Sequence, residues 1–431
     1  MGKRTVEKSV TVGFAGMTHL GLVSSAATAD AGFKTICYDT DIGLIESLRK
    51  GNLPVREPHL DNLVAANSAR LTFTSDQRAL GDCNIVYISI DVPTDDEARS
   101  DLSVIDAQVQ RVIPHLNATA LLVILCQVPP GFTRSIKNIP LERLYCQVET
   151  LVFGRAVERA QKPERYIVGC AAPERPIDPR LQALFSAFSC PVLPMRYESA
   201  ELAKIAINCC LVASIGVTNT LAELSEEIGA DWNEIMPSLR LDARIGPKAY
   251  LSPGLGIAGG NLERDLQTVI GLARRHNTDS GMIVALLANS DHCKTWAARM
   301  ARRLIKPGAT LAVWGLAYKE NTHSTKNSPS LASISLLQDY KIAVHDPAVP
   351  ITVVNHPDAR ATAEPLDALH NADLLMILTP WPQYREIAPN LIAESLKGLV
   401  VLDPFRVLDP SKSRSAGLDW HTLGVPFVGK S

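Results

Sequence analysis

The chain has 431 residues, which is enough for two or three domains that each bury a core of their own. Its 43 Lys and Arg residues against 45 Asp and Glu residues give a formal net charge of −2, so it has no overall electrostatic reason to bind nucleic acid or an anionic membrane surface. With 46% hydrophobic and 20% charged residues, the composition is that of a folded globular protein and excludes a disordered chain.

Short apolar runs alternate with helical patterns in the first half of the chain. This alternation is typical of a parallel sheet flanked by helices. We expect strands at residues 10–15, 35–38, 84–89 and 120–125. A second block of the same kind begins near residue 310, with strands expected at residues 310–314, 341–345 and 373–378. The sequence therefore predicts two α/β lobes.

The segment between the lobes, residues 199–303, is rich in Ala, Leu and Glu and has a helical period. A helix over residues 200–228 would be about 40 Å long and would offer an apolar stripe to a second copy of the chain, so we expect a homodimer. The predicted fold is α/β, with two Rossmann-like doubly wound lobes joined by a helical dimerisation core with a long central helix. The predicted domains are residues 1–198, 199–303 and 304–431, and Lys306-Pro307-Gly308-Ala309 marks the last boundary.

The cysteines and the hydropathy of the chain indicate its cellular compartment. The nine cysteines show no C-x-x-C spacing, and only Cys209 and Cys210 are adjacent, so we expect neither a disulfide framework nor a metal site. A reducing cytoplasm fits this pattern best. The longest apolar stretch, residues 205–217, contains Asn208 and Ser214 and is shorter than the roughly 20 residues of a membrane-spanning helix, so we expect no such segment.

A candidate dinucleotide site follows the first strand, at Gly16-Met17-Thr18-His19-Leu20-Gly21. A strand-to-helix turn here would direct backbone N–H groups and a helix dipole toward a pyrophosphate. Thr18 replaces the middle glycine of the usual G-x-G-x-x-G pattern, which weakens the motif. Asp39 strengthens it, because an acidic residue about 20 positions further on can accept hydrogen bonds from a ribose diol, and this predicts NAD over NADP. The alternative is an ordinary βαβ turn with a surface aspartate.

Further segments, in the order in which they occur, match a known family. They are residues 51–60, 128–131, 199–204 with Asn208, 242–246, 253–260, 315–319, 345–347 and 379–381. With these segments the sequence resembles the nucleotide-sugar dehydrogenases typified by UDP-glucose 6-dehydrogenase almost end to end. The resemblance implies an NAD-binding Rossmann lobe, a helical dimerisation core and a lobe that holds a UDP-sugar, in a cytoplasmic enzyme of polysaccharide biosynthesis. Members of the family oxidise C6 of the sugar twice with two NAD, and the second oxidation passes through a cysteine thiohemiacetal and thioester.

The resemblance assigns catalytic roles to four residues that match the family. Lys204 and Asn208 lie one helical turn apart and would hold the developing alkoxide, while Asp265 would order a water or help to take the proton. Glu149 occupies the position of the family's first catalytic glutamate. The alternative for Lys204 is a solvated lysine on a helix.

The resemblance also implies two sets of binding residues. The cofactor-binding set is Gly16, Thr18, Leu20, Gly21, Asp39, Pro93, Thr94 and Gln127. The substrate-binding set is Arg244, Tyr250, Gly256, Lys319 and Arg406. Arg244 resembles an arginine that reaches the sugar nucleotide across the dimer, and the alternative for Arg244 and Lys319 is a surface cation.

The reaction centre departs from the family at three positions. Asn261 stands where the nucleophilic cysteine is expected, and it is included among the catalytic positions for that reason. Gln127 replaces a threonine, and Phe153 replaces the second glutamate. Two binding segments also differ, since Phe405 fills the place of an arginine that Arg406 could replace, and residues 322–329 lack an acidic pair and an arginine.

An amide cannot form a thioester, so the usual second oxidation loses its covalent intermediate. The sequence therefore predicts an NAD-dependent oxidoreductase that acts on a CH–OH group of a nucleotide sugar and stops after two electrons, or returns the hydride in a redox-neutral conversion. Three alternatives remain open: full oxidation through a hydrated aldehyde, a replacement thiol at Cys126, and a catalytically silent protein that binds NAD and a nucleotide sugar.

Overall fold

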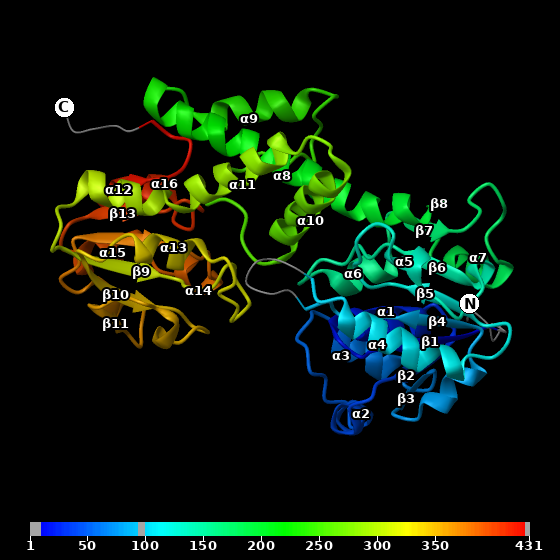
Figure 1. The fold of residues 1–431 in the computed structure, drawn as a ribbon. Helices are drawn as coiled ribbons and strands as arrows, with labels where there is room; N and C mark the ends of the chain where they lie inside the picture. Colours follow the sequence, from blue (N-terminus) through cyan, green and yellow to red (C-terminus); the bar gives the residue numbers. More distant parts are fainter. Residues whose placement is uncertain (1–9, 94–99, 427–431) are drawn as a thin grey trace, which may run out of the picture. The chain divides into compact units, whose positions relative to one another are not determined.

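The computed structural model describes residues 10–93 and 100–426, so the predicted cofactor residue Thr94 lies outside the described residues. The chain divides into two compact units, Met1–Ile207 and Asn208–Ser431, called unit 1 and unit 2 below. Figure 1 shows the chain coloured from the N-terminus to the C-terminus. The division into domains 1–198, 199–303 and 304–431 stays a prediction.

Unit 1 is built on an eight-stranded sheet with strand order β3-β2-β1-β4-β5-β6-β7-β8. All neighbouring strands are parallel except β6 and β7. Apolar residues dominate β1, β4 and β5, and these residues are almost all buried, because helices cover both faces. The strands are β1 Thr11–Ala15, β2 Lys34–Tyr38, β3 Leu71–Thr74, β4 Ile85–Ile88, β5 Leu121–Ile124, β6 Leu144–Gln147, β7 Tyr166–Cys170 and β8 Val192–Arg196.

Helices of unit 1 lie against its sheet (Figure 1), and two layers of buried apolar side chains hold them there. One layer packs α1, α2, α3, α6 and α7 against one face, and the other packs α4 and α5 against the opposite face. The helices are α1 His19–Asp30, α2 Ile42–Arg49, α3 Leu60–Ala66, α4 Ser103–Val112, α5 Phe132–Ser135, α6 Ala156–Gln161 and α7 Pro179–Ser186.

A single helix, α8 Tyr197–Ile228, contains the boundary between the units. Its first part belongs to unit 1, where the buried carboxylate of Glu201 accepts hydrogen bonds from the backbone N–H groups of Gly131 (2.6 Å) and Thr133 (2.8 Å). Glu201 thereby satisfies the backbone donors at the beginning of α5. The predicted long central helix is present and is longer than residues 200–228.

In its described residues, unit 2 contains eight further α-helices, α9 to α16, and a six-stranded parallel sheet with strand order β11-β10-β9-β12-β13-β14. The helices that precede the sheet are α9 Trp232–Leu241, α10 Asn261–His276, α11 Gly281–Lys294 and α12 Trp296–Leu304. The strands are β9 Thr310–Trp314, β10 Lys341–His345, β11 Ala359–Ala361, β12 Leu374–Ile377, β13 Val400–Leu402 and β14 Asp419–His421, and the helices between them are α13 Pro329–Ser335, α14 Pro382–Arg385, α15 Pro389–Ser395 and α16 Pro410–Ser415.

Both sheets have the order 3-2-1-4-5-6 at their core, which is that of the doubly wound dinucleotide-binding fold. The predicted fold class, α/β with two Rossmann-like lobes and helices between them in sequence, is confirmed. The seven predicted strands occur within one residue of their expected ends. The strands that we did not predict include the edge strands β3, β8, β11 and β14 and several short ones.

Among the described residues, α8 is the one helix whose length and mean hydropathy match those of a membrane-spanning segment. The expectation of no such segment rested on the shorter stretch 205–217, whereas the helix has 32 residues. In its most apolar window, 39% of the residues are buried within the chain. Core helices satisfy the same two criteria, so length and hydropathy alone do not define α8 as a membrane span.

Candidate active site

The predicted cofactor residues of unit 1 lie at one edge of its sheet. Strands β1, β2, β4, β5 and β6 are mutually parallel, so their carboxyl ends meet at this edge. Gly16 follows β1, Asp39 follows β2, Pro93 follows β4 after a short connection, Gln127 follows β5 and Glu149 follows β6. The carboxyl edge next to the first strand is where ligands bind in open sheets of this kind.

The turn between β1 and α1 depends on two glycines. Gly16 has a φ of +109°, and its N–H donates to the carbonyl of Tyr38 over 2.8 Å. A Cβ at Gly16 would lie 2.1 Å from Cγ2 of Ile90, and one at Gly21 would lie 1.8 Å from the carbonyl oxygen of Gly16. Neither position can accept a side chain without movement of the backbone. These glycines bring the beginning of α1 close to the end of β1.

Thr18 precedes α1 but does not cap it with its side chain. Its hydroxyl donates to the carbonyl of Ser89 over 3.3 Å and accepts the N–H of Asp91 over 3.0 Å. The side chain therefore ties the turn to the end of β4. The backbone N–H groups of the first turn of α1 are left without a side-chain acceptor from Thr18, which suits an anion at this helix end.

Asp39 orders the same turn from the end of β2. One carboxylate oxygen accepts the N–H of Met17 over 2.7 Å, and the other accepts the N–H of Asp41 over 3.0 Å. Two bonds leave lone pairs on both oxygens for a diol. Leu20, in contrast, is buried in the core beneath α1, so it supports the turn by packing. The glycines, the uncapped helix end and Asp39 together fit an adenine dinucleotide without a 2′-phosphate.

Glu149 and Lys204 form an ion pair in unit 1. The Lys204 ammonium lies 3.6 Å from a carboxylate oxygen of Glu149, and both side chains are 18% exposed. The other Glu149 oxygen accepts the N–H of Leu151. Burial raises the pKa of Glu149, and the charge of Lys204 opposes this rise. The carboxylate is thus a stronger base than an exposed glutamate and has a cation beside it.

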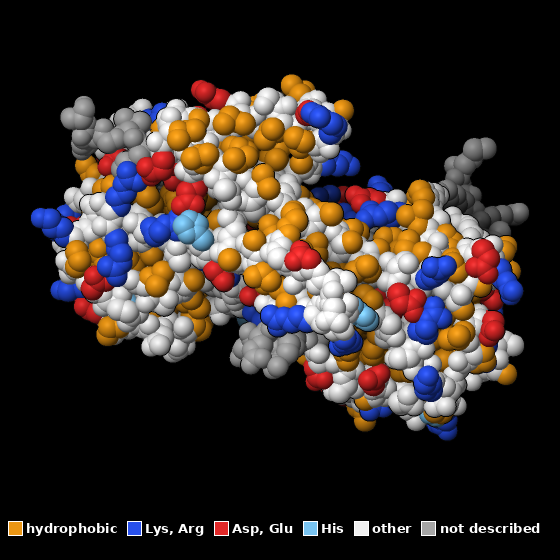
Figure 2. Space-filling view, turned by 45° about the horizontal axis from the view of Figure 1, so that its top comes forward, with side chains coloured by type: hydrophobic (Ala, Val, Ile, Leu, Met, Phe, Trp, Pro, Cys, Tyr) orange, Lys and Arg blue, Asp and Glu red, His pale blue; other side chains and the backbone are white. Residues whose placement is uncertain are grey.

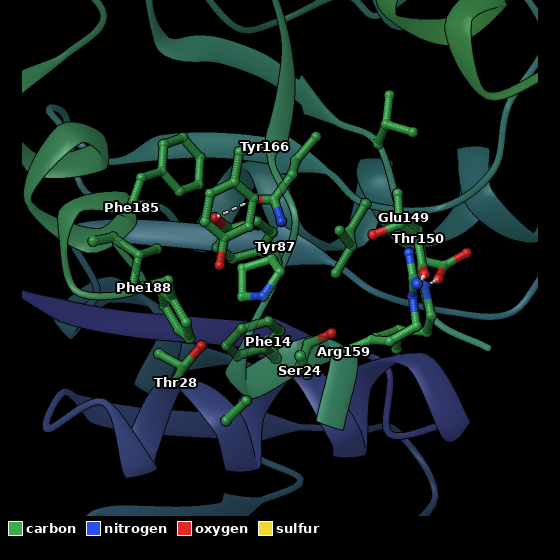
Figure 3. A pocket seen from close by; sticks show the side chains of 18 residues that line it. Phe14, Ser24, Thr28, Tyr87, Glu149, Thr150, Arg159, Tyr166, Phe185 and Phe188 are labelled. Carbon is green, nitrogen blue, oxygen red and sulfur yellow. Dashed lines mark hydrogen bonds between the residues drawn. The ribbon is translucent and has the colours of Figure 1, made fainter. Parts of the chain in front are cut away.

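A cavity of about 60 Å³ lies behind the segment that contains Glu149 (Figure 3). Its walls include the rings of Phe14, Tyr87, Tyr166, Phe185 and Phe188. The Tyr87 hydroxyl donates to Oε1 of Gln147 over 2.8 Å, and Glu149 and Thr150 lie at the far end from Phe185 and Phe188 (Figure 3). The cavity is lined by Ser24, Ala27 and Thr28 of α1 and by the segment after β6, and no residue of the turn at residues 16–21 contributes to its wall, so it is not the dinucleotide site.

Asn208 and Asp265 are bonded to each other in unit 2. Nδ2 of Asn208 donates to a carboxylate oxygen of Asp265 over 2.6 Å, and both residues are buried. The other oxygen of Asp265 lies 3.5 Å from Nε of Arg264, whose side chain is also buried. The amide of Asn208 is therefore fixed by another member of the predicted catalytic set. Lys204 precedes Asn208 by one turn of α8.

Asn261 is the first residue of α10 and is exposed, four residues before Asp265. The segment before it is held in place by its neighbours in unit 2. The N–H of Ile257 donates to the Ser290 hydroxyl over 2.9 Å, and the N–H of Gly259 donates to the carbonyl of Lys326 over 3.1 Å. The predicted substrate residue Gly256 has a φ of +77°, and a Cβ there would lie 2.5 Å from the Ser290 carbonyl oxygen. A glycine is therefore needed at position 256 because the backbone passes close to α11.

The remaining predicted substrate residues are spread over unit 2. The Arg244 side chain is 89% exposed and pairs with Asp242 over 2.7 Å. Tyr250 is 53% exposed, and its carbonyl accepts the hydroxyl groups of two residues of α8. Lys319 follows β9 and Arg406 follows β13, so both lie at the carboxyl edge of the second sheet. Burial lowers the pKa of Arg406, while Asp231 and Asp403 oppose the change.

Two cysteines near the predicted site are packed rather than activated. Cys126 is buried, its thiol donates to the carbonyl of Ile88 over 3.3 Å, and burial raises its pKa to about 12. Cys209 packs with Ile257 and Leu266, and burial together with Asp265 raises its pKa. Neither thiol is poised to form the thiolate that nucleophilic catalysis requires. All nine cysteines are free thiols.

Sequence reasoning missed three groups that the structure places at these sites. Arg264 could not be found from the sequence, because an arginine in the first turn of a helix is usually exposed to solvent. Its burial beside Asp265 depends on tertiary packing. The Lys326 side chain lies beside the backbone of Gly260, directly before Asn261. A Cβ at Gly260 would lie 3.4 Å from the Lys326 side chain. His19, within the dinucleotide motif, is buried and bonded to Glu57.

The fold and these residues define a doubly wound dinucleotide-binding enzyme. Family models of the UDP-glucose/GDP-mannose dehydrogenase family match three parts of the chain: the NAD binding domain at residues 10–189, the central domain at residues 198–291 and the UDP binding domain at residues 312–410. The chain belongs to the UDP-glucose/GDP-mannose dehydrogenase family. NAD is its cofactor, and it is an oxidoreductase of the nucleotide-sugar dehydrogenase type.

Individual relatives agree with this assignment along their whole lengths. The chain is 28% identical over 430 residues to UDP-glucose 6-dehydrogenase TuaD of Bacillus subtilis, covering 96% of this chain and 93% of that protein. It is 28% identical over 440 residues to UDP-glucose 6-dehydrogenase of Rhizobium meliloti, covering 95% and 98%. The fold matches a UDP-glucose dehydrogenase from Pyrobaculum islandicum with a TM-score of 0.80 at 24% identity, covering 99% and 98%, and an NDP-N-acetyl-D-galactosaminuronic acid dehydrogenase from Methanosarcina mazei with a TM-score of 0.79 at 21% identity, covering 96% and 95%.

Proposed function

We propose that this protein is an NAD-dependent oxidoreductase that acts on a CH–OH group of a UDP-linked sugar, and that its chemistry ends after one two-electron step or returns the hydride in a redox-neutral conversion. The UDP binding domain model and the relatives that are named as UDP-glucose 6-dehydrogenases support the substrate class. The limit to two electrons is supported by Asn261, which stands four residues before Asp265 where the family resemblance expects a nucleophilic cysteine.

Four side chains supply the chemistry in this proposal. Lys204 and Asn208 offer N–H donors, one helical turn apart, to the oxygen of the carbinol as negative charge develops on it. Glu149 takes the hydroxyl proton directly or through a water, because burial raises the pKa of its carboxyl group. Asp265 orients Asn208 through their 2.6 Å hydrogen bond. NAD, when bound, accepts the hydride from the carbinol carbon.

Asn261 decides the fate of the aldehyde that the first oxidation produces. A thiol at this position would add to the aldehyde and give a thiohemiacetal, from which a second hydride can leave. The amide of Asn261 is not a nucleophile, and the thiols of Cys126 and Cys209 are packed groups whose pKa values are raised by burial. The aldehyde is therefore not held by a covalent bond, so it leaves the site or is reduced again.

We further propose that the protein is a cytoplasmic homodimer. The second half of α8 exposes Val217, Leu221, Leu224 and Ile228, with 41–66% of each residue accessible. Their spacing of four, three and four residues places them on one face of the helix. Figure 2 shows hydrophobic side chains gathered over the part of unit 2 that contains α8 and α9. The nine free thiols support a reducing compartment.

The stoichiometry of NADH to sugar tests the proposal. The purified protein is incubated with NAD and each of a panel of UDP-sugars, NADH is followed at 340 nm, and the sugar products are identified by mass spectrometry. We expect one NADH per converted sugar, or a converted sugar without net NADH. Rapid formation of a uronate with two NADH per sugar would contradict the two-electron limit, and no conversion of any sugar would favour the silent binding protein.

Two variants of one position sharpen this experiment. Asn261→Cys restores the thiol and should raise the yield toward two NADH per sugar, with the uronate as product. Asn261→Ser is the matched control, because it is equally small but provides no thiol, and its yield should stay at one or below. Since Asn261 is exposed at the beginning of α10, both variants should fold like the parent protein.

A further inference from the structure

One buried carboxylate in unit 1 joins the dinucleotide turn to the segment that contains Glu149. Glu57 has a side chain that is only 1% exposed. Its Oε2 lies 3.1 Å from Nε2 of His19 and accepts the N–H of Gly154 over 3.0 Å, while its Oε1 accepts the N–H of Ala156 over 2.8 Å. Three donors from two distant parts of the chain thus converge on a single side chain.

The first of these parts is the N-terminus of α1. His19 is the first residue of that helix, directly after Thr18, and it is buried. Its ring is held in place by Glu57 on one side. Because dinucleotides bound by this fold place their pyrophosphate at this helix end, a bound NAD would lie next to the His19 ring.

The second part is the segment of residues 148–155 between β6 and α6. It begins with Glu149 near β6 and ends at the N-terminus of α6, where Glu57 accepts two backbone N–H groups. Between these points, the ring of Phe153 stacks on the ring of His19 with 4.2 Å between centroids and 24° between planes. Phe153 is nevertheless 54% exposed.

We infer that Phe153, stacked on His19, forms one wall of the dinucleotide site and contacts bound NAD, and that Glu57 is the positioning residue that holds this wall and the Glu149 segment against the N-terminus of α1. The large apolar surface that Phe153 leaves exposed beside a helix N-terminus suits a flat heterocycle or a ribose face, which pack on aromatic rings. The inference rests on the proposed function for the role of Glu149 but not for the contact with NAD.

The contact is tested by calorimetric titration of the purified full chain with NAD in the absence of any sugar. Phe153→Ala should weaken NAD binding by about tenfold, the size expected for one lost ring contact. Phe153→Tyr keeps the ring and should bind within about twofold of the parent protein. Val152→Ala is the matched control, because Val152 is the neighbouring residue and is 50% exposed, and it should also stay within about twofold. Parent-like binding by Phe153→Ala would overturn the inference.

The role of Glu57 is tested by a double-mutant cycle in the same titration. The amide of Glu57→Gln cannot accept all three donors, so the rings of His19 and Phe153 are no longer held in place. Adding Phe153→Ala to Glu57→Gln should therefore lower the affinity for NAD by less than about threefold. Independent tenfold losses from the two changes would overturn the positioning role. If Glu57→Gln lowers the thermal midpoint too far for titration, the Phe153 variants decide alone, since Phe153 is exposed.

Kinetics with a UDP-sugar that the parent protein converts give a second readout. Glu57→Gln should raise the KM for NAD and lower kcat, while the KM for the sugar stays constant. A merely structural loss would lower the active fraction and leave both KM values unchanged, which would contradict the inference. If no sugar is converted by the parent protein, the proposed function fails, but the NAD titrations still test the wall formed by Phe153.

Discussion

Glu226 is a buried carboxyl group of α8 whose ionisation should control the stability of unit 2. Its Oε1 accepts the N–H of Gly424 over 2.8 Å, and its Oε2 accepts Nε1–H of Trp296 over 3.1 Å. Burial raises its pKa to about 7, and the neighbouring Glu223 and Glu227 add to this effect. Glu223 and Glu227 pair with the arginines Arg299 and Arg303 of α12, whereas both bonds to Glu226 come from neutral N–H donors.

The sign and size of the effect follow from the two pKa values. The folded group binds a proton more tightly than the unfolded one, whose pKa is about 4.5. The contribution of Glu226 to the free energy of unfolding is fully present below pH 4.5. It is lost as the pH rises to about 7, at about 1.4 kcal/mol per pH unit. The total is on the order of 3 kcal/mol. Glu226→Gln removes the slope, at a pH-independent cost of about 1 kcal/mol because an amide can accept only one of the two donors.

Tryptophan fluorescence reports this transition selectively, because all five tryptophans lie in unit 2. Urea unfolding is measured at several pH values from 5 to 8 for the parent protein, Glu226→Gln and the control Glu227→Gln. Glu227 is 59% exposed and pairs with Arg303, so its replacement should change stability by less than about 1 kcal/mol at every pH. The difference between the parent and Glu226→Gln should shift by about 3 kcal/mol across this range. If the unfolding free energies of the parent protein and Glu226→Gln change in parallel with pH, the reasoning is refuted.

Two further predictions concern unit 1, and the matched control of the second lies in unit 2. Glu201→Ala leaves two backbone donors at the start of α5 without their acceptor and should cost about 2–4 kcal/mol of unfolding free energy by circular dichroism, whereas Glu198→Ala, which removes an exposed ion pair, should cost less than about 1 kcal/mol. Gly21→Ala places a Cβ 1.8 Å from the Gly16 carbonyl oxygen and should abolish NAD binding in a titration. Gly271→Ala in α10 meets no atom within 4 Å and should instead raise stability by about 0.5–1 kcal/mol. Full NAD binding by Gly21→Ala would show that the turn adapts.

The sequence was informative where the structure depends on local pattern. Buried parallel strands are continuous apolar runs, so β1, β4, β5, β9 and β12 could be placed within one residue. Edge strands are harder to predict. β3 has four residues and alternates with threonine, and β8 is partly exposed and contains a proline, so both patterns resemble those of loops.

The site was predictable only in part, for a related reason. Asn208 and Asp265 could be assigned to one catalytic set because each lies in or beside a family motif, and a 2.6 Å hydrogen bond joins them in the structure. Glu57 could not be connected with His19 and Ala156, because these residues are separated by 38 and 99 positions and share no period. Contacts of this kind are set by how two loops meet at the end of a sheet, which no local pattern records.

The two lobes repeat one turn but use its carboxylate differently. Gly16 and Gly315 have φ values of +109° and +97°, and each N–H donates over 2.8 Å to the last residue of the neighbouring strand. Asp39 then accepts two N–H groups, whereas Asp346 accepts five, from the turn, from its own loop and from Trp381. Five donors occupy the lone pairs that a ribose diol would need, so Asp346 is structural. The dinucleotide is therefore assigned to the first lobe. Lys319 and Arg406 follow β9 and β13 at the same edge of the second sheet, and we propose that they recognise a nucleotide there.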